Sequence, residues 1–165
     1  MVTQEPIPNK GTPPRLLVDA MLGRLARWLQ LMGYDAAYWR DGSDAALIRQ
    51  ARDEDRWIVT RDHQLAGRRG VRAVLVASEA LNEQIAGVRA VLRSFDPGDP
   101  EPFSRCPECN GKLEDLPAEA ARPRVPPYVW HTQSLFRQCP DCSRVYWRGT
   151  HWPGMQARLD LGGDK

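Results

Sequence analysis

The alternation of apolar and polar positions predicts strands and helices in turn over residues 15–95. Short apolar runs of the kind found in buried parallel strands stand at 15–19, 34–39, 57–60 and 72–77. Between them, apolar residues recur at spacings of three and four, as on one face of a helix: Leu22, Leu25, Leu29 and Met32; Leu47, Ile48 and Ala51; Leu81, Ile85, Val88, Leu92 and Phe95. Strands that alternate with helices predict an α/β fold, a parallel sheet flanked by helices.

Two proline-containing segments bound this predicted larger domain. Residues 1–14 end in Pro13 and Pro14 and lack the apolar stretch of a signal peptide, so we expect a disordered lead-in. Residues 96–102 contain three prolines, which favour neither helix nor strand, and are predicted to be a linker. Beyond the linker the composition shifts to Cys, Arg, Pro and aromatic residues. We expect a small module there over residues 103–155, followed by a tail at 156–165.

Length and composition narrow the class of protein. A chain of 165 residues can form one ordinary domain with a small satellite. The net charge of +2 argues neither for nor against nucleic acid as a partner. No apolar run reaches the length of a membrane span, so none is expected. Without an export signal we expect a cytoplasmic protein, in which cysteines are more often metal ligands than disulfides.

Four cysteines form two Cys-x-x-Cys pairs in the small module. Cys106 and Cys109 lie in CPECNG, and Cys139 and Cys142 lie in CPDCSR. Each pair can present two sulfurs to one ion, and two pairs make a tetrahedral Zn²⁺ site with no open position, which predicts a structural zinc in a zinc ribbon. The 29 residues between the pairs exceed the usual spacing, so we expect a loop containing RPRVPP to bulge from the ribbon. The alternative is a redox motif, but that motif typically comes singly at the start of a helix.

The small module also carries a combination typical of RNA-binding surfaces. Five arginines and one acid lie between residues 120 and 149, interleaved with Tyr128, Trp130, Phe136, Tyr146 and Trp147. Arginines contact phosphates, and aromatic faces stack on the unpaired bases of single-stranded RNA. In the alternative interpretation the aromatic residues pack the small module onto the larger domain and the arginines are only solvated. The two interpretations are compatible.

Three aspartates are predicted to lie at one edge of the parallel sheet. Asp19 ends the first strand and Asp62 ends the third. Asp44 lies at the start of the second helix, after its candidate N-cap Ser43, and Asp41 is a nearby substitute. Ligands of α/β sheets bind outside the carboxyl ends of the strands, and carboxylate oxygens suit Mg²⁺ or Mn²⁺. The alternative for each aspartate is helix capping. A cluster of three favours a cation site, because carboxylates repel one another unless a cation neutralises them.

A set of longer motifs covers about residues 15–155: LLVDAMLGRLARWLQLMGYDA, TRD, FSRCPECNGKLE and CPDCSRVYWRGTHWPGM. Together they closely resemble the Mut7-C ribonuclease domain family. The resemblance implies a PIN-like domain with a C-terminal zinc ribbon, and a nuclease whose acidic cluster holds Mg²⁺ or Mn²⁺. It matches Asp19 and Asp62 to the acids of the LLVD and TRD motifs, Asp44 to the acid of the second helix, and Thr60 to a supporting threonine. PIN nucleases often have a fourth acid, which this sequence does not place.

We therefore expect a metal-dependent ribonuclease that hydrolyses RNA phosphodiester bonds. Its catalytic acids, which hold one or two Mg²⁺ or Mn²⁺ ions, are predicted to be Asp19, Asp44 and Asp62. Three arginines are expected to flank this site and to hold the RNA backbone: Arg24, Arg27 and Arg61. The alternative is that they form a solvated surface without this role. The zinc ribbon is expected to present RNA to the site. A second hypothesis is a non-catalytic protein that binds RNA or a protein partner, through the ribbon or through the α/β domain.

Overall fold

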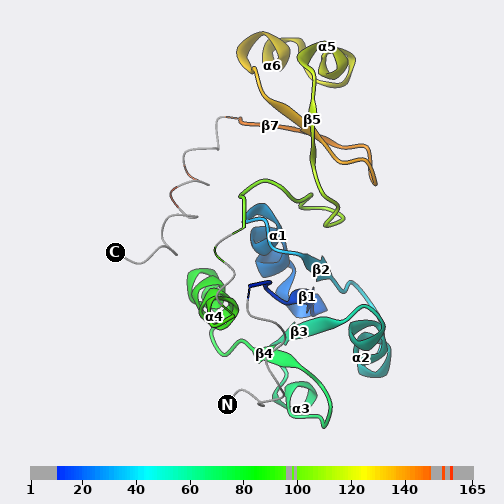
Figure 1. Ribbon diagram of the computed structural model, residues 1–165, viewed down its shortest axis with the longest axis vertical. Coiled ribbons are helices and arrows are strands. Elements are labelled where there is room, and N and C mark those ends of the chain that lie inside the picture. Colours follow the sequence, from blue (N-terminus) through cyan, green and yellow to red (C-terminus); the bar gives the residue numbers. More distant parts are fainter. Residues whose placement is uncertain (1–10, 96–97, 99, 150–153, 155–156, 158–165) are drawn as a thin grey trace.

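The computed structural model describes residues 11–95, 98, 100–149, 154 and 157. Four strands form a parallel sheet in the order β2-β1-β3-β4: β1 (Arg15–Val18), β2 (Ala36–Tyr38), β3 (Arg56–Thr60) and β4 (Ala73–Leu75). The helical elements connecting and following them are η1 (Ala20–Leu22), α1 (Gly23–Leu31), α2 (Asp44–Asp53), α3 (His63–Ala66) and α4 (Leu81–Arg93) (Figure 1). The predicted α/β class, with helices flanking a parallel sheet, is confirmed.

Successive side chains of β1 point to opposite faces of the sheet, and both faces are buried. This explains why the strands are continuous apolar runs in the sequence. Leu16 and Val18 belong to a core cluster with α1 and α4, whereas Leu17 belongs to a second cluster with α2 and α3. Most of the apolar positions that predicted the helices are buried in these clusters: Leu22, Leu25, Leu29, Met32, Leu47, Ala51, Ile85, Val88, Leu92 and Phe95. None of the helices in the described part of the chain is long and apolar enough to cross a membrane.

The small module contains an antiparallel sheet in the order β5-β6-β7, built from β5 (Glu114–Leu116), β6 (Phe136–Gln138) and β7 (Val145–Trp147). The long insertion between β5 and β6 is helical rather than an open loop: α5 (Ala118–Ala121), η2 (Arg122–Arg124) and α6 (Pro127–Thr132) lie beyond one end of the sheet (Figure 1). It closes a core of five buried hydrophobic residues: Leu116, Ala121, Val125, Val129 and Phe136. The predicted bulge thus has a packing role of its own.

The predicted domain limits rest only partly on described residues. The predicted lead-in 1–14 and tail 156–165 lie almost wholly outside them, and so does part of the linker 96–102. The division into 15–95 and 103–155 therefore stays a prediction.

The small module docks against the larger domain through Asp35, which lies just before β2. The Asp35 carboxylate accepts hydrogen bonds from Arg56 (2.6 Å) and Asn110 (2.7 Å), and it pairs with Arg105 (3.2 Å) and Arg15 (3.3 Å). Burial raises the pKa of Asp35, but the hydrogen bonds from Arg56 and Asn110 and the nearby positive charges outweigh it and hold the pKa below its usual value. One carboxylate therefore connects Asn110 and Arg105 of the small module to the core of the larger domain.

The side chain of Asn110 also completes the edge of the parallel sheet. In the described sheet β2 is an edge strand, so its outward backbone groups are not paired with another strand there. Asn110 Oδ1 accepts the buried N–H of Ala36 at 3.0 Å, and the side chain of Gln30 donates to the carbonyl of Ala36 at 2.7 Å. The first cysteine turn therefore covers this edge.

Gly33 lets the chain return across the end of α1. It has a φ of +92°, and a Cβ there would lie 2.2 Å from the carbonyl oxygen of Glu101. Next to this crossing, the N–H of Phe103 donates to the carbonyl of Leu31 at 2.8 Å. Glycine is therefore required where the segment leading into the small module passes over the helix.

We expect Asp35→Asn to lower the free energy of unfolding by about 2 kcal/mol, less than the roughly 3–5 kcal/mol for breaking a fully buried ion pair. The discount applies because 20% of the Asp35 side chain is exposed. Since the pKa of Asp35 is lowered by folding, its contribution is fully present at neutral pH and is lost as the pH falls below about 3.8. Urea unfolding at several pH values measures the difference. Asp53→Asn, at an exposed position on α2, is the matched control; equal stability of the two variants at neutral pH would contradict this role of Asp35.

Candidate functional site

The strand order places a ligand-binding position between β1 and β3. From β1 the chain moves to β2 on one side and then crosses to β3 on the other, so the switch point of the sheet lies between β1 and β3. Asp19 directly follows β1, and its N–H donates to the carbonyl of Val59 in β3 at 2.9 Å. Thr60 ends β3 and Asp62 follows two residues later. The fold thus brings Asp19 and Asp62 to the edge where open α/β sheets bind their ligands.

The Thr60 hydroxyl joins these two aspartates. Thr60 is fully buried, and its Oγ1 donates to Asp19 Oδ2 at 2.6 Å. The same oxygen accepts the backbone N–H of Asp62 at 3.1 Å. One side chain therefore sets the orientation of the Asp19 carboxylate and the course of the chain at Asp62.

Helix capping explains one of these aspartates and not the other. Asp62 is the N-cap of α3, and its Oδ1 accepts the N–H groups of Gln64 (2.7 Å) and Leu65 (3.0 Å). Asp19 precedes η1 but makes no side-chain capping bond. Among the described residues, Thr60 is the hydrogen-bond partner of its carboxylate. The capping alternative therefore fails for Asp19 and accounts for one oxygen of Asp62.

Asp44 lies at the start of α2 and is paired with Arg68 at 3.1 Å. The predicted N-cap Ser43 is confirmed, since its hydroxyl accepts the N–H of Ala46 at 3.3 Å. Asp41, the substitute for Asp44, is exposed beyond β2. Within the described ranges, no three acidic residues offer oxygens that all lie within 4.8 Å of one another. The structure brings Asp19 and Asp62 together, whereas Asp44 is occupied by its arginine.

The three predicted flanking arginines differ in their partners. Arg27 forms an ion pair with Glu108 of the first cysteine turn, and Arg61 pairs with Glu79 at 2.8 Å. Arg24 is exposed on α1, with no ion-pair or hydrogen-bond partner in the described part of the chain. Two of these arginines thus hold acidic partners, and Arg24 is directly available to a ligand.

Glu79 is a carboxylate that the sequence analysis did not single out. It follows β4, so it comes from the same carboxyl edge of the sheet as Asp19 and Asp62. The hydrogen bond and positive charge of Arg61 lower the pKa of Glu79. Its position just after a predicted strand was the signal that could have found it.

The four cysteines are positioned to bind one metal ion. Their sulfur atoms all lie within 4.8 Å of one another, with 3.6 Å between Cys106 and Cys142 and 3.4 Å between Cys109 and Cys139. A tetrahedral Zn²⁺ with Zn–S bonds of about 2.3 Å holds its sulfurs about 3.8 Å apart, close to these separations. The cluster can therefore form a zinc site.

The two cysteine turns share one backbone geometry. The residue after each pair, Asn110 or Ser143, is left-handed with φ of 67° or 60°. Its N–H donates to the carbonyl of the first cysteine of the pair, at 2.9 Å in one turn and 2.8 Å in the other. Gly111 has a different role, because a Cβ there would lie 2.2 Å from the Asp141 carboxylate of the second turn. These contacts let the two turns face each other closely.

Hydrogen bonds prepare Cys106 to act as a thiolate ligand. Burial raises the pKa of its thiol, but the hydroxyl of Tyr146, 3.0 Å from Sγ, and the N–H groups of Cys109 and Glu108 outweigh burial and bring the pKa to about 7. Burial is also the main cause that raises the pKa values of Cys109 and Tyr146. A thiol near pKa 7 readily exchanges its proton for a metal at neutral pH.

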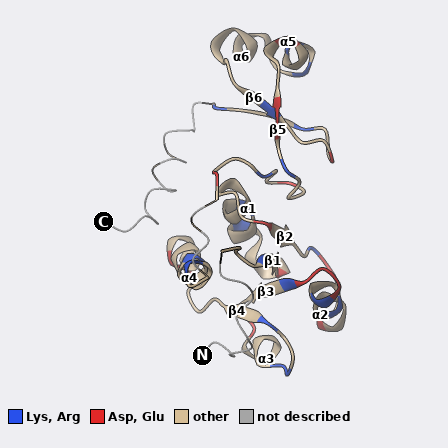
Figure 2. Cartoon of the chain, in the orientation of Figure 1, with Lys and Arg blue, Asp and Glu red and all other residues tan. Residues whose placement is uncertain are grey.

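The aromatic residues of the small module divide between packing and exposure. Phe136 is buried in the small core, and Trp130 is held by a hydrogen bond to the carbonyl of Ala118 (3.1 Å) and by Arg122, 4.7 Å from its ring centre. They pack within the module rather than onto the larger domain. Tyr128 and Trp147 are exposed, and basic residues are spread over both parts of the chain (Figure 2). Part of the predicted RNA surface is thus structural, and part is available for binding.

The chain matches a known protein family. A family model described as the Mut7-C RNAse domain matches residues 14–159. No curated protein and no solved structure matches the chain. The matched residues include both the aspartates at the sheet edge and the four cysteines.

Proposed function

The chain belongs to the Mut7-C RNAse domain family, and from this we propose that it is a metal-dependent ribonuclease that hydrolyses RNA phosphodiester bonds. The observation that carries the proposal is the pairing of Asp19 and Asp62 through the buried hydroxyl of Thr60 at the switch point of the sheet. Capping does not account for Asp19. A carboxylate fixed at this position, with Thr60 as its one side-chain partner among the described residues, is suited to binding a cation.

The donor set fits Mg²⁺ or Mn²⁺. Asp19 and Asp62 each have one oxygen engaged by the protein, which leaves the other for an ion. Asp44 would also bind the ion if the ion replaced Arg68 as the partner of its carboxylate. An open set of this kind suits Mg²⁺, which keeps several waters and takes one or two carboxylates together with substrate phosphate. When bound, the ion supplies charge stabilisation at the phosphate and lowers the pKa of the attacking water.

The protein's own residues hold and orient this site. Thr60 fixes the Asp19 carboxylate, and the N-terminus of α3 fixes Asp62, so neither side chain has to be ordered when RNA binds. Arg24, exposed on the helix that follows Asp19, is placed to contact the RNA backbone. Arg27 and Arg61 would have to leave Glu108 and Glu79 to do so.

We further propose that the cysteine site holds a structural Zn²⁺. Four thiolates fill a tetrahedral ion, so no position remains for substrate or water. The first cysteine turn packs on α1 and β2 through Arg27, Asp35 and Ala36. The ion would therefore also maintain the docked position of the small module.

A second candidate function is a non-catalytic RNA-binding protein. It is favoured by the Asp44–Arg68 ion pair and by the capping bonds of Asp62, which both give acidic residues a structural role. In that case the exposed arginines and aromatic residues would bind RNA, and the RNA would not be cleaved.

Incubation of the purified protein with single-stranded, hairpin and duplex RNAs tests the two candidates. We expect cleavage in Mn²⁺ or Mg²⁺ and none in their absence, because without the ion the negative carboxylates and the negative phosphate repel one another. Mapping the cut positions shows whether the enzyme acts internally or from an end. The control contains Zn²⁺ as the added divalent ion, which separates the effect of the acidic site from that of the ribbon. RNA that is bound but left intact under all these conditions would favour the binding protein.

A further inference from the structure

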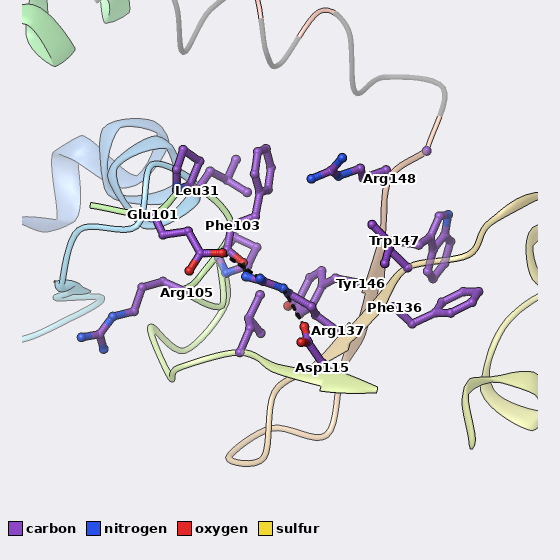
Figure 3. A pocket seen from close by; sticks show the side chains of 15 residues that line it. Leu31, Glu101, Phe103, Arg105, Asp115, Phe136, Arg137, Tyr146, Trp147 and Arg148 are labelled. Carbon is purple, nitrogen blue, oxygen red and sulfur yellow. Dashed lines mark hydrogen bonds and ion pairs between the residues drawn. The ribbon is translucent and has the colours of Figure 1, made fainter. Parts of the chain in front are cut away.

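A cavity of about 460 Å³ lies between the sheet of the small module and the segment that leads into it, at the C-terminal end of α1 (Figure 3). Ligand sites in proteins commonly measure roughly 300–1,000 Å³. The lining is mainly apolar and includes Leu31, Pro102, Phe103, Leu113, Tyr146 and Trp147. None of the aspartates proposed for catalysis contributes to it.

Arg137 of β6 braces one wall of this cavity. It donates to the carbonyl of Phe103 at 2.8 Å. It also pairs with Glu101 (2.8 Å) and Asp115 (3.2 Å), and dashed lines in Figure 3 mark ion pairs with these carboxylates. Its charge is thereby matched by two carboxylates. The wall is therefore held in place before any ligand binds, which reduces the cost of ordering on binding.

Phe103 and Tyr146 line the cavity from different segments. Phe103 has a φ of +61°, a conformation that bulky side chains rarely adopt and that concentrates at functional sites. Tyr146 of β7 is fixed by the contact of 3.0 Å between its hydroxyl and Cys106 Sγ, so the cysteine site positions this ring. Fixed aromatic side chains form platforms on which nucleobases stack.

Arg148 supplies a positive charge at the same cavity. It follows β7, is exposed, and extends across the space toward Phe103 in Figure 3. An arginine beside an apolar space can bind a phosphate while the attached base enters that space. This combination of charge and aromatic surface complements a nucleotide better than it does a neutral apolar molecule.

We propose that this cavity is a subsite for one unstacked nucleobase of single-stranded RNA, which stacks on Phe103 or Tyr146 and places its phosphate at Arg148. The proposal rests on the proposed function, because it takes RNA as the substrate. Asp19 precedes α1 and Leu31 ends it, so the length of α1, about 12 Å at about 1.5 Å per residue, separates the acidic site from the cavity. The subsite therefore holds the strand away from the bond that is cut, and it anchors longer RNAs.

Binding of labelled oligouridine to the full chain tests this subsite, in the Asp19→Asn background and as a function of salt concentration. Phe103→Leu keeps an apolar side chain but removes the ring, and we expect it to weaken binding about 10-fold with the salt dependence unchanged. Arg148→Ala is expected to reduce the slope of log affinity against log salt by about 0.7, the value for one phosphate contact with a single strand. The matched controls are Phe103→Tyr, which keeps the ring, and Arg49→Ala, which removes an arginine at an exposed position on α2, outside the cavity.

Equal zinc content and melting temperature in all variants establish that the fold is intact. If Phe103→Leu and Arg148→Ala bind RNA no differently from the two controls, the subsite proposal is overturned. A loss shared equally by the controls also overturns it, since the whole surface would then bind without a defined subsite. Cleavage is measured separately on the parent protein, so failure of the ribonuclease proposal is recognised there without deciding the binding comparison.

Discussion

Asp19→Asn is expected to lower the rate of metal-dependent RNA cleavage by about 1,000-fold, the order observed when one group that stabilises transition-state charge is removed. Asparagine has nearly the same size and can still accept the hydrogen bond that the Thr60 hydroxyl donates to Asp19. The substitution therefore removes the negative charge and leaves the buried contact. Measurement of kcat/KM in Mn²⁺, with the melting temperature of the same preparation, separates lost chemistry from lost folding.

Asp62→Asn provides an independent check, because asparagine caps helices as well as aspartate and should preserve the start of α3. The matched control is Asp53→Asn, which makes the same change at an exposed position at the far end of α2. We expect a large loss with Asp62→Asn and wild-type rates with Asp53→Asn. If both Asp19→Asn and Asp62→Asn cleave RNA at the wild-type rate, the acidic site is not catalytic.

The elements of the larger domain were predictable because their signals are local. The continuous apolar run of Leu16, Leu17 and Val18, which the structure divides between two buried faces, is visible in the sequence, and so are the helical stripes. The carboxyl edge followed from parallel strands, and this placed Asp19 and Asp62 at one side of the sheet. The short helix α3 was not predicted, because four residues are too few to show a helical spacing of apolar positions. Its local signal is the N-cap residue Asp62.

Contacts between distant residues were not predictable. Asp35 lay inside a recognised motif, but its role depends on Arg56 and on Arg105, which are 21 and 70 positions away. Asp44 was correctly placed at the start of α2, yet no local pattern shows that Arg68 pairs with it. The four cysteines could be predicted as ligands because the spacing within each Cys-x-x-Cys pair is a local signal. The docking of the first cysteine turn through Asn110 could be seen only in the folded structure.

Cys139→Ser is expected to abolish metal binding by the small module and to unfold it. Zinc binding contributes about 10–16 kcal/mol in zinc-finger peptides, as much as or more than the roughly 5–15 kcal/mol of total stability of ordinary domains. The described core of the module has only five buried hydrophobic residues, so packing cannot replace that contribution. Elemental analysis should show one zinc per chain in the wild type and none in the variant, with increased proteolysis between residues 103 and 149.

Cys142→His tests whether the ion or the thiol chemistry is what matters. Cys142 is the more exposed member of its pair, and histidine is also a zinc ligand, so this variant should keep close to one zinc per chain and resist proteolysis. A redox role would be lost in both variants, since each breaks the same Cys-x-x-Cys pair. Cys139→Ser protein that retained its zinc and its protease resistance would refute the metal assignment. Because the first turn is tied to Asp35 and Ala36, metal loss should also lower the melting temperature of the larger domain.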